Sequence, residues 1–497
     1  MSFFPCFSLE TWVFLLVFLV LLLLYGIWPY NFFKKLGIPG PRPLPFGVVH
    51  FDMKCHQKYG KIWGFFDGRQ PVLAILDPAM IKTILVKEFY THFTNRRGFG
   101  LYGELDTSVA LVSDEQWRRI RTVLSPTFTC GRLKEMMPII NHYGEVLLKN
   151  FQKRVENTES IDTKVTSLSI DVDSINNSRD PFVKKVQKLF KSSFVNPLLI
   201  LTVVFPFLTP LLEKLNFTLI PSSVVNYFMV VVKKIKNNRQ KDKHMEHVDF
   251  LQLLVESQFS GDISDGANFY KGKHKGSLTD KEILTQAITF IFAGYESTST
   301  SLNYLSYSLA THPDVQQKLQ EEIDKILPNQ APPTYDAILQ MEYLDMVMNE
   351  NLRLYPPAGR VDRICKNTVE IHGVTIPKGT VVMIPAFVLH RLPEYWPEPE
   401  EFRPERFSKE NKETFDPYTF LPFGTGPRNC IGMRFAVLVI KVAVVVLLQN
   451  FFFRTCKETP IPLELKSQVC MQPKKLIKLR FIPRKAAGSE EQRDKKL

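Results

Sequence analysis

The stretch Phe423-Gly-Thr-Gly-Pro-Arg-Asn-Cys-Ile-Gly432 places one cysteine, Cys430, in a glycine-rich loop. The apolar segment Met433–Asn450 follows directly and is predicted to form a helix. A thiolate is the form of cysteine that binds metal, and its pKa falls when backbone N–H groups and a helix N-terminus point at the sulfur. The glycines let the backbone turn closely around the side chain. The loop therefore predicts a thiolate ligand for iron.

Two other positions of this loop have roles of their own. Phe423 can shield the sulfur from water, and Arg428 can pair with a carboxylate on the group that carries the metal. The alternative interpretation is a buried free cysteine beside an ordinary turn. Five fixed positions within one short loop favour the metal site over that alternative.

The loop matches the pattern F-x-x-G-x-R-x-C-x-G, and the chain here resembles the cytochrome P-450 superfamily, the haem-thiolate monooxygenases. The resemblance implies a mainly α fold with a small β-rich region, and haem b as the cofactor. It also implies that Cys430 is the axial ligand of the haem iron, with Arg428 at a haem propionate and Phe423 against the cofactor. A thiolate axial ligand donates electron density to iron and favours cleavage of the O–O bond.

A long, buried helix is predicted from Thr279 to about Ala310. Thr279-Asp-Lys-Glu282 is a capping box, which marks the start of the helix. The middle reads Ala293-Gly-Tyr-Glu-Ser-Thr298, and a carboxylate and two hydroxyls are unfavourable inside a buried helix unless something uses them. The alternative is a glycine that lets two helices pack closely, with the polar residues facing solvent.

This motif resembles the oxygen-activation motif of the superfamily, A/G-G-x-D/E-T-T/S. The resemblance implies that Glu296, Ser297 and Thr298 are catalytic, with Glu296 and Ser297 relaying protons to dioxygen at the haem. The chain departs from the motif at Ser297, where threonine is usual. Serine keeps the hydroxyl and loses the methyl group that restricts χ1, so we expect less precise placement of the hydroxyl and more leakage to peroxide.

Further cofactor contacts follow from the same resemblance. Trp117-Arg-Arg-Ile-Arg121 resembles the W-x-x-x-R of a helix that covers one haem edge, which implies that Trp117 and Arg121 bind a propionate. Arg96 and Arg363 are implied as additional cofactor contacts. The two arginines at positions 118 and 119 are interpreted as surface charges.

A structural network is expected near the cysteine loop. Glu350-Asn-Leu-Arg353 puts a carboxylate and a guanidinium one helical turn apart. Pro404-Glu-Arg-Phe407 matches the superfamily segment whose arginine joins that pair, so the resemblance implies a buried triad of Glu350, Arg353 and Arg406. A patch of short strands is expected over residues 369–384, and the rest of the domain is expected to be mostly helical.

The N-terminal end predicts a membrane anchor. Trp12–Trp28 is an uncharged apolar run, marginally long enough to cross a bilayer and bounded by aromatic residues. Lys34 and Lys35 follow it, which by the positive-inside rule puts the rest of the chain in the cytosol. A cleaved signal peptide is the alternative, but no basic region precedes the run and no small-residue cleavage site follows it.

The expected organisation has four parts. These are a single-pass anchor (1–28), a basic and proline-rich linker (29–45), a haem-thiolate catalytic domain (46–483) and a polar, disordered tail (484–497). A second apolar region, Phe194–Leu212, is interrupted by three prolines. It is interpreted either as buried core or as a loop that dips into the bilayer surface beside a substrate entrance.

Composition narrows the class of protein further. The net charge is +13, with 63 basic and 50 acidic residues spread along 497 positions and no nucleic-acid motif, which favours a membrane surface or an acidic protein partner over nucleic acid. The seven cysteines are scattered and form no C-x-x-C pair, which argues against a disulfide framework and a zinc site.

Over nearly its whole length the chain is similar to family three, subfamily A, of the cytochromes P-450. The resemblance implies an endoplasmic-reticulum monooxygenase of steroids and lipophilic drugs. Its electrons would come from NADPH through a flavoprotein reductase, with a small haem electron carrier as a further partner. The substrate pocket would be lined by Phe99, Ala110, Phe292, Ala293 and Ala358.

Several departures from the subfamily affect folding more than chemistry. The chain is shorter than the pattern over residues 46–51 and 153–180, and Leu392 replaces an acid. A lost helix could remove a domain's whole margin of stability. Two alternatives therefore stay open: an inactive or poorly folded membrane-bound binder of haem or lipophiles, and a haem-thiolate isomerase that needs neither oxygen nor reductase.

Overall fold

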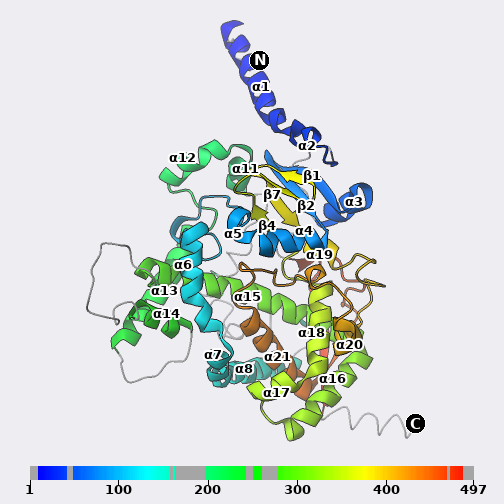
Figure 1. The fold of residues 1–497 in the computed structure, drawn as a ribbon. Coiled ribbons are helices and arrows are strands. Elements are labelled where there is room, and N and C mark those ends of the chain that lie inside the picture. Colours follow the sequence, from blue (N-terminus) through cyan, green and yellow to red (C-terminus); the bar gives the residue numbers. More distant parts are fainter. Residues whose placement is uncertain are drawn as a thin grey trace, which may run out of the picture.

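The computed structural model describes residues 9–41, 49–156, 160–162, 185, 196–241, 250–259, 277–466 and 471–484. A helical body carries a small β-sheet at one end, and the N-terminal helix α1 projects from that end (Figure 1). The helices are α1 (Leu9–Ile27), α2 (Phe32–Lys35), α3 (Val49–Tyr59), α4 (Pro78–Lys82), α5 (Phe89–His92), α6 (Asp114–Leu124), α7 (Cys130–Glu135), α8 (Met137–Val155), α11 (Pro197–Val204), α12 (Thr209–Lys214), α13 (Ser222–Lys241), α14 (Phe250–Phe259), α15 (Asp280–Thr311), α16 (Pro313–Ile326), α17 (Tyr335–Gln340), α18 (Glu342–Leu354), α19 (Ala386–Leu389), α20 (Lys409–Lys412) and α21 (Met433–Asn450).

Helix α15 crosses the middle of the body (Figure 1) and confirms the predicted long helix. The side chain of Thr279 accepts a hydrogen bond from the backbone N–H of Glu282, and the Glu282 carboxylate accepts one from the N–H of Thr279. This capping box satisfies two backbone donors that the helix itself cannot pair.

The predicted helix after the cysteine loop is also confirmed, as α21. It packs against α15, α16 and α8, and the buried side chains at their contacts form the largest apolar core. Among the described residues, Met433–Asn450 is the one helix whose length and composition would suit a membrane span, and most of it is buried in this core. Its apolar character is therefore explained by packing inside the body.

The main sheet is only partly predicted by the sequence. Its strand order is β1-β2-β7-β4, from β1 (Ile62–Asp67), β2 (Gln70–Ile75), β7 (Val381–Ile384) and β4 (Val361–Ile364). The remaining strands are β3 (Ile161–Asp162), β5 (Val369–Ile371), β6 (Val374–Ile376), β8 (Phe451–Thr455), β9 (Leu465–Lys466), β10 (Gln472–Pro473) and β11 (Lys478–Pro483). Strands β5, β6 and β7 confirm the expected patch, whereas β1, β2, β8 and β11 were not predicted.

The pair β1–β2 lacks a recognisable strand signal because its middle is buried on both faces. Residues 63–66 and 72–75 are all buried, so polar and apolar side chains do not alternate along either strand. Strand β2 pairs in parallel with β7, with Val72 opposite Val381. The sheet therefore joins the N-terminal part of the chain to the segment that precedes the cysteine loop.

The interrupted apolar region near residue 200 forms two helices at a sharp bend. Helix α11 and the segment Pro206–Lys214, which includes α12, are bent by 109°. Thr202 and Val203 of α11 are buried, whereas Phe207 and Leu211 are exposed. Part of the region is therefore buried core, and the bilayer-surface interpretation stays a prediction for the exposed part. The shortened regions 46–51 and 153–180 lie largely outside the described residues; Leu392 is buried in the sheet-side core.

Candidate active site

The loop before α21 holds Cys430 by backbone contacts that only small residues permit. The N–H of Cys430 donates to the carbonyl of Phe423 at 2.9 Å, which closes the loop on itself. Gly426 has φ of +74°, and a Cβ on it would lie 1.9 Å from the carbonyl oxygen of Leu85. Any side chain at Gly426 would clash with that backbone, so only glycine lets the loop approach the backbone at Leu85 this closely.

The electrostatic environment of Cys430 favours a ligated thiolate more than a free one. Burial raises the pKa of the thiol, while the backbone N–H of Gly432 and the guanidinium groups of Arg96 and Arg121 lower it. Cys430 is nevertheless an exposed residue. The described residues contain no cluster of three metal-binding side chains, so a metal held by Cys430 would not belong to a site built from several protein ligands.

A group of arginines surrounds the loop without acidic partners. Arg96, Arg121, Arg363 and Arg428 form no ion pair with any described carboxylate. Burial, followed by repulsion from Arg96, lowers the pKa of Arg363 and of Arg428 to about 9. The Nε atoms of Arg363 and Arg428 are buried and make no hydrogen bond to the described residues. Buried donors of this kind are rare and indicate a missing anionic partner.

These arginines also hold the loop in place. Arg121 donates to the backbone and side-chain oxygens of Asn429, both at 2.9 Å. Arg428 donates to the carbonyls of Thr94 at 2.8 Å and Val112 at 2.7 Å, and its guanidinium lies 5.1 Å from the ring centre of Trp117. The donor set therefore fits a group that brings carboxylates close to the thiolate, which is the chemistry of a haem with its two propionates.

The acid and the hydroxyl of α15 are held in different ways. Glu296 is buried, and its Oε1 accepts hydrogen bonds from Gln472 Nε2 at 2.8 Å and from Thr300 Oγ1 at 3.4 Å. Ser297 Oγ donates to the carbonyl of Ala293 at 2.7 Å. Thr298 is partly buried beside them.

The middle of α15 also borders open space. Ala293 and Gly294 are exposed, whereas the residues on either side are mostly half-buried, and a Cβ on Gly294 would meet nothing within 4 Å. The residues expected to line the substrate pocket differ in exposure. Ala358 is exposed and Ala110 is half-buried, while the ring of Phe292 lies against Phe228. Phe99 lines a separate cavity near the end of α1.

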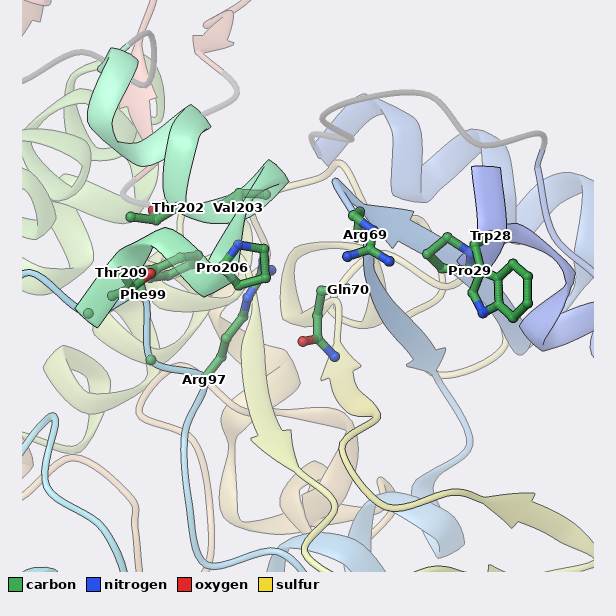
Figure 2. A pocket seen from close by; sticks show the side chains of 12 residues that line it. Trp28, Pro29, Arg69, Gln70, Arg97, Phe99, Thr202, Val203, Pro206 and Thr209 are labelled. Atoms are coloured by element: carbon green, nitrogen blue, oxygen red, sulfur yellow. The ribbon is translucent and has the colours of Figure 1, made fainter. Parts of the chain in front are cut away.

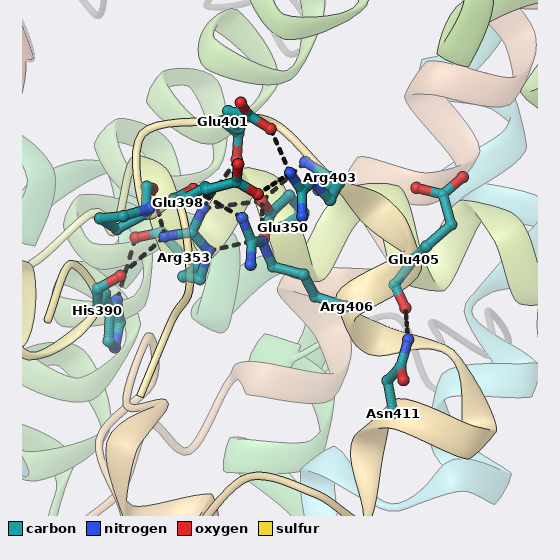
Figure 3. A network of polar contacts seen from close by, with 10 residues as sticks. Glu350, Arg353, His390, Glu398, Glu401, Arg403, Glu405, Arg406 and Asn411 are labelled. Carbon is teal, nitrogen blue, oxygen red and sulfur yellow. Dashed lines mark hydrogen bonds and ion pairs between the residues drawn. The ribbon is translucent and has the colours of Figure 1, made fainter. Parts of the chain in front are cut away.

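Glu350, Arg353 and Arg406 lie in direct contact (Figure 3). Arg353 donates to both carboxylate oxygens of Glu350, at 2.7 and 2.8 Å, and neither side chain is exposed. Arg406 Nε lies 3.3 Å from Glu350 Oε1. Remaining donors of Arg353 reach the carbonyl oxygens of His390 and Pro399. The buried charges are thus fully hydrogen-bonded, which is the condition for such a pair to be tolerated.

His390 connects this network to the cysteine loop and was not identified from the sequence. Its Nδ1 contacts the carbonyl of Arg353 at 3.2 Å, and its Nε2 accepts a hydrogen bond from the N–H of Leu421 at 2.8 Å. Burial, with repulsion from Arg391 and Arg353, lowers the pKa of His390 to about 3. The neutral ring can accept the bond from Leu421, whereas an imidazolium could not.

This linkage predicts acid sensitivity. Between pH 6.5 and about 3 the unfolded chain binds a proton at His390 that the folded chain does not. Stability is therefore lost as pH falls below 6.5, by up to about 1.4 kcal/mol per pH unit for this group. Chemical denaturation of the wild type and of His390→Gln at pH 7 and pH 5.5 measures the effect. The variant should be less stable at pH 7 and lose less on acidification; an equal loss in both proteins would rule out His390 as the group responsible.

Two further contacts were also missed by sequence reasoning. Gln472 holds Glu296 from a strand 176 residues away, which no local pattern indicates. Arg119, interpreted as a surface charge, forms an ion pair with the buried Glu282 of the capping box. The sequence around either residue does not indicate this ion pair, because it joins Arg119 of α6 to Glu282 of α15, 163 residues further along the chain.

The fold and this site define a haem-thiolate protein. Residues 46–481 match the family model for cytochrome P450. The chain is 56% identical to cytochrome P450 3A29 of Sus scrofa, over 97% of this chain and 99% of that one. It is 55% identical to cytochrome P450 3A12 of Canis lupus familiaris and 52% identical to cytochrome P450 3A40 of Oryzias latipes, with the same coverage.

The chain therefore belongs to the cytochrome P450 family and, within it, to the 3A group. It is a cytochrome P450 monooxygenase, an oxidoreductase whose cofactor is haem with a cysteine thiolate as axial ligand, and it acts on steroids and xenobiotics. This confirms the predicted family, enzyme class and cofactor.

Proposed function

We propose that this enzyme inserts one oxygen atom of O2 into C–H bonds of bulky lipophilic substrates at a site between Cys430 and the middle of α15. The observation that carries the proposal is the exposed Cys430 among arginines without acidic partners. Haem, when bound, supplies the iron that activates dioxygen and accepts electrons. Cys430 would be its axial ligand, with Phe423 packed beside the loop.

The arginines would orient the cofactor. Arg96, Arg121, Arg363 and Arg428 would offer guanidinium groups to two propionates, and the guanidinium of Arg428 lies over the ring of Trp117. Charge-assisted bonds of this type fix a planar group in one orientation. The propionates would offset both the burial and the mutual repulsion that lower the pKa of Arg363 and Arg428.

Proton delivery would use the acid and hydroxyl of α15. Gln472 and Thr300 hold one oxygen of Glu296, which keeps the carboxylate inside the helix bundle. Ser297 Oγ–H now donates to the Ala293 carbonyl; rotation about χ1 would turn that proton toward the open side of the helix. We infer that this rotation passes a proton to dioxygen and that Thr298 supports the relay. The open side is where Ala293 and Ala358 would meet the substrate.

The relay predicts opposite effects of two substitutions at position 297. Ser297→Ala removes the hydroxyl, so product formed per NADPH should fall several-fold while peroxide rises. Ser297→Thr restricts χ1 and should raise that ratio above wild type. Product, NADPH and peroxide are measured in parallel. An unchanged ratio in Ser297→Ala would show that this hydroxyl does not carry the proton.

We also propose that residues 1–28 anchor the protein in the endoplasmic-reticulum membrane, with residues 29–45 as a linker, residues 46–483 as a cytosolic catalytic domain and residues 484–497 as a tail. Apolar side chains of α1 are exposed along its length. Tyr25 of α1 stacks on Phe205, with ring centres 5.9 Å apart, and meets Phe207 edge-on. These contacts, together with the exposed Leu211, would extend the apolar surface of α1 onto the bent segment α11–α12. The bent segment would then lie at the bilayer surface.

Reconstitution tests the proposed reaction. The full-length protein, loaded with haem in bilayer discs, is mixed with a flavoprotein NADPH reductase and a steroid. Hydroxylated product that requires NADPH, O2 and the reductase is the expected result. A small haem electron carrier, added as a second partner, should raise the rate of the second electron transfer. Haem uptake without product under these conditions would favour the inactive binder, and rearranged product without O2 would favour the isomerase.

A further inference from the structure

A cavity of about 490 Å³ lies where the end of α1 meets the sheet and the bent segment α11–α12. Figure 2 shows Trp28 and Pro29 on one side, Arg69 and Gln70 at the start of β2 in the middle, and the bent segment on the other side. The segment Arg97–Gly100 completes the wall. The cavity thus opens next to the proposed membrane anchor and is separate from Cys430.

Close backbone packing fixes the walls of this cavity. Gly68, in the β1–β2 turn, has φ of +61°, and a Cβ on it would lie 2.5 Å from Val203 Cγ1. A Cβ on Gly100 would lie 2.4 Å from Thr209 Cγ2. The elements that form the cavity walls are therefore closely packed against one another, because only glycine fits at these two contacts.

The charges that line the cavity are not balanced. Arg97 pairs with Asp67 at 2.5 Å, and its backbone N–H donates to Asp362. Glu213, on α12, accepts a hydrogen bond from the N–H of Leu101. Arg69 forms no ion pair with any described residue, so its positive charge remains uncompensated.

Two buried polar atoms here, one on Arg69 and one on Tyr25, also lack a hydrogen-bond partner among the described residues. Its guanidinium lies over the ring of Tyr25, 3.5 Å from the ring centre. Arg69 Nε and the Tyr25 hydroxyl are both buried and make no hydrogen bond to the described residues. The amide nitrogen of the neighbouring Gln70 is a donor, which bonds to the carbonyls of Gly379 and Pro71, so it cannot accept a hydrogen bond from Arg69 Nε. Adjacent buried donors without an acceptor indicate an anionic ligand.

We propose that this cavity binds the phosphate group of an anionic glycerophospholipid, with Arg69, which lines the cavity, as its charged contact. A guanidinium fork suits phosphate oxygens, which are acceptors only. The exposed Trp28 lies at the rim, where an aromatic residue of a membrane interface is expected. Exposed Phe207 and Leu211 beside the cavity would contact the acyl chains, which favours a lipid over free phosphate. The proposal rests on the anchor proposed above.

Spin-labelled lipids provide the test. Haem-loaded full-length protein is placed in phosphatidylcholine discs that contain a small fraction of spin-labelled phosphatidylglycerol or spin-labelled phosphatidylcholine. The motionally restricted fraction of each lipid is measured by electron paramagnetic resonance. We expect the wild type to restrict phosphatidylglycerol in preference to phosphatidylcholine, and Arg69→Gln to lose this preference by roughly fivefold, the effect of one basic residue near an anionic headgroup.

The control is Lys35→Gln, which removes the same charge from an exposed position on the membrane side but outside the cavity. It should keep the preference. Equal loss in both variants would mean general attraction to an anionic surface and would overturn the site, as would a wild type without preference. Displacement of the lipid by millimolar inorganic phosphate would assign the site to free phosphate and contradict the lipid. Flotation with pure phosphatidylcholine vesicles tests the anchor separately, because it does not depend on Arg69.

Discussion

Replacement of Cys430 by alanine is expected to lower monooxygenase turnover by more than about a thousandfold, equivalent to at least about 4 kcal/mol of activation free energy. The loop and the arginines would still form a recess, but the loop would offer no sulfur to the iron. Without a thiolate the O–O bond would lose the electron density that promotes its cleavage.

Two further variants test whether the loss of turnover comes from loss of the Cys430 sulfur. Cys430→Ser keeps the size of the side chain and offers an oxygen ligand, so it should retain more haem than Cys430→Ala and remain inactive. Cys130→Ala removes an exposed cysteine at the start of α7 and should leave turnover unchanged. Haem content and product are measured for each protein. Substantial turnover by Cys430→Ala would mean that another residue is the axial ligand.

Arg353→Met is expected to destabilise the protein by about 3–5 kcal/mol, because it leaves the carboxylate of Glu350 buried without its main partner. The loss should extend to the active site. Arg353 anchors the carbonyl of His390, and His390 in turn holds the backbone of Leu421 just before the cysteine loop. We therefore expect faster loss of thiolate ligation in this variant as well as a lower denaturation midpoint.

Arg403→Met is the matched control for this prediction. Arg403 lies in the same region of Figure 3 and pairs with Glu398 and Glu401, but these side chains are exposed, so water replaces the lost contact. Its denaturation midpoint should stay close to that of the wild type. Similar midpoints for the two variants would show that burial does not set the strength of this network.

The parts of the fold that could be predicted were those with local signals. The capping box at Thr279 and the apolar segment after Cys430 each contain their evidence within one stretch of chain. Strands β1 and β2 were missed because their middles are buried on both faces and their partner β7 lies some three hundred residues further on. Pairing over that distance leaves no pattern in a single sequence.

The residues of the candidate site also divide into those that local motifs predict and those that they do not. Cys430, Glu350 and Arg353 stand in short motifs, so their contacts with neighbours could be inferred. Gln472 and His390 act through single hydrogen bonds to distant segments, and nothing around them in the sequence indicates a polar partner. The effect of the shortened stretch 153–180 on stability stays a prediction, because it lies largely outside the described residues.

The central claim is that Cys430 ligates a haem iron as a thiolate. The most direct test is the absorption spectrum of the haem-loaded, full-length protein after reduction and addition of carbon monoxide. The account predicts the strongly red-shifted Soret band that a thiolate ligand opposite carbon monoxide produces, and its absence from Cys430→Ser. A Soret band at the unshifted position in folded, haem-loaded wild-type protein would contradict it.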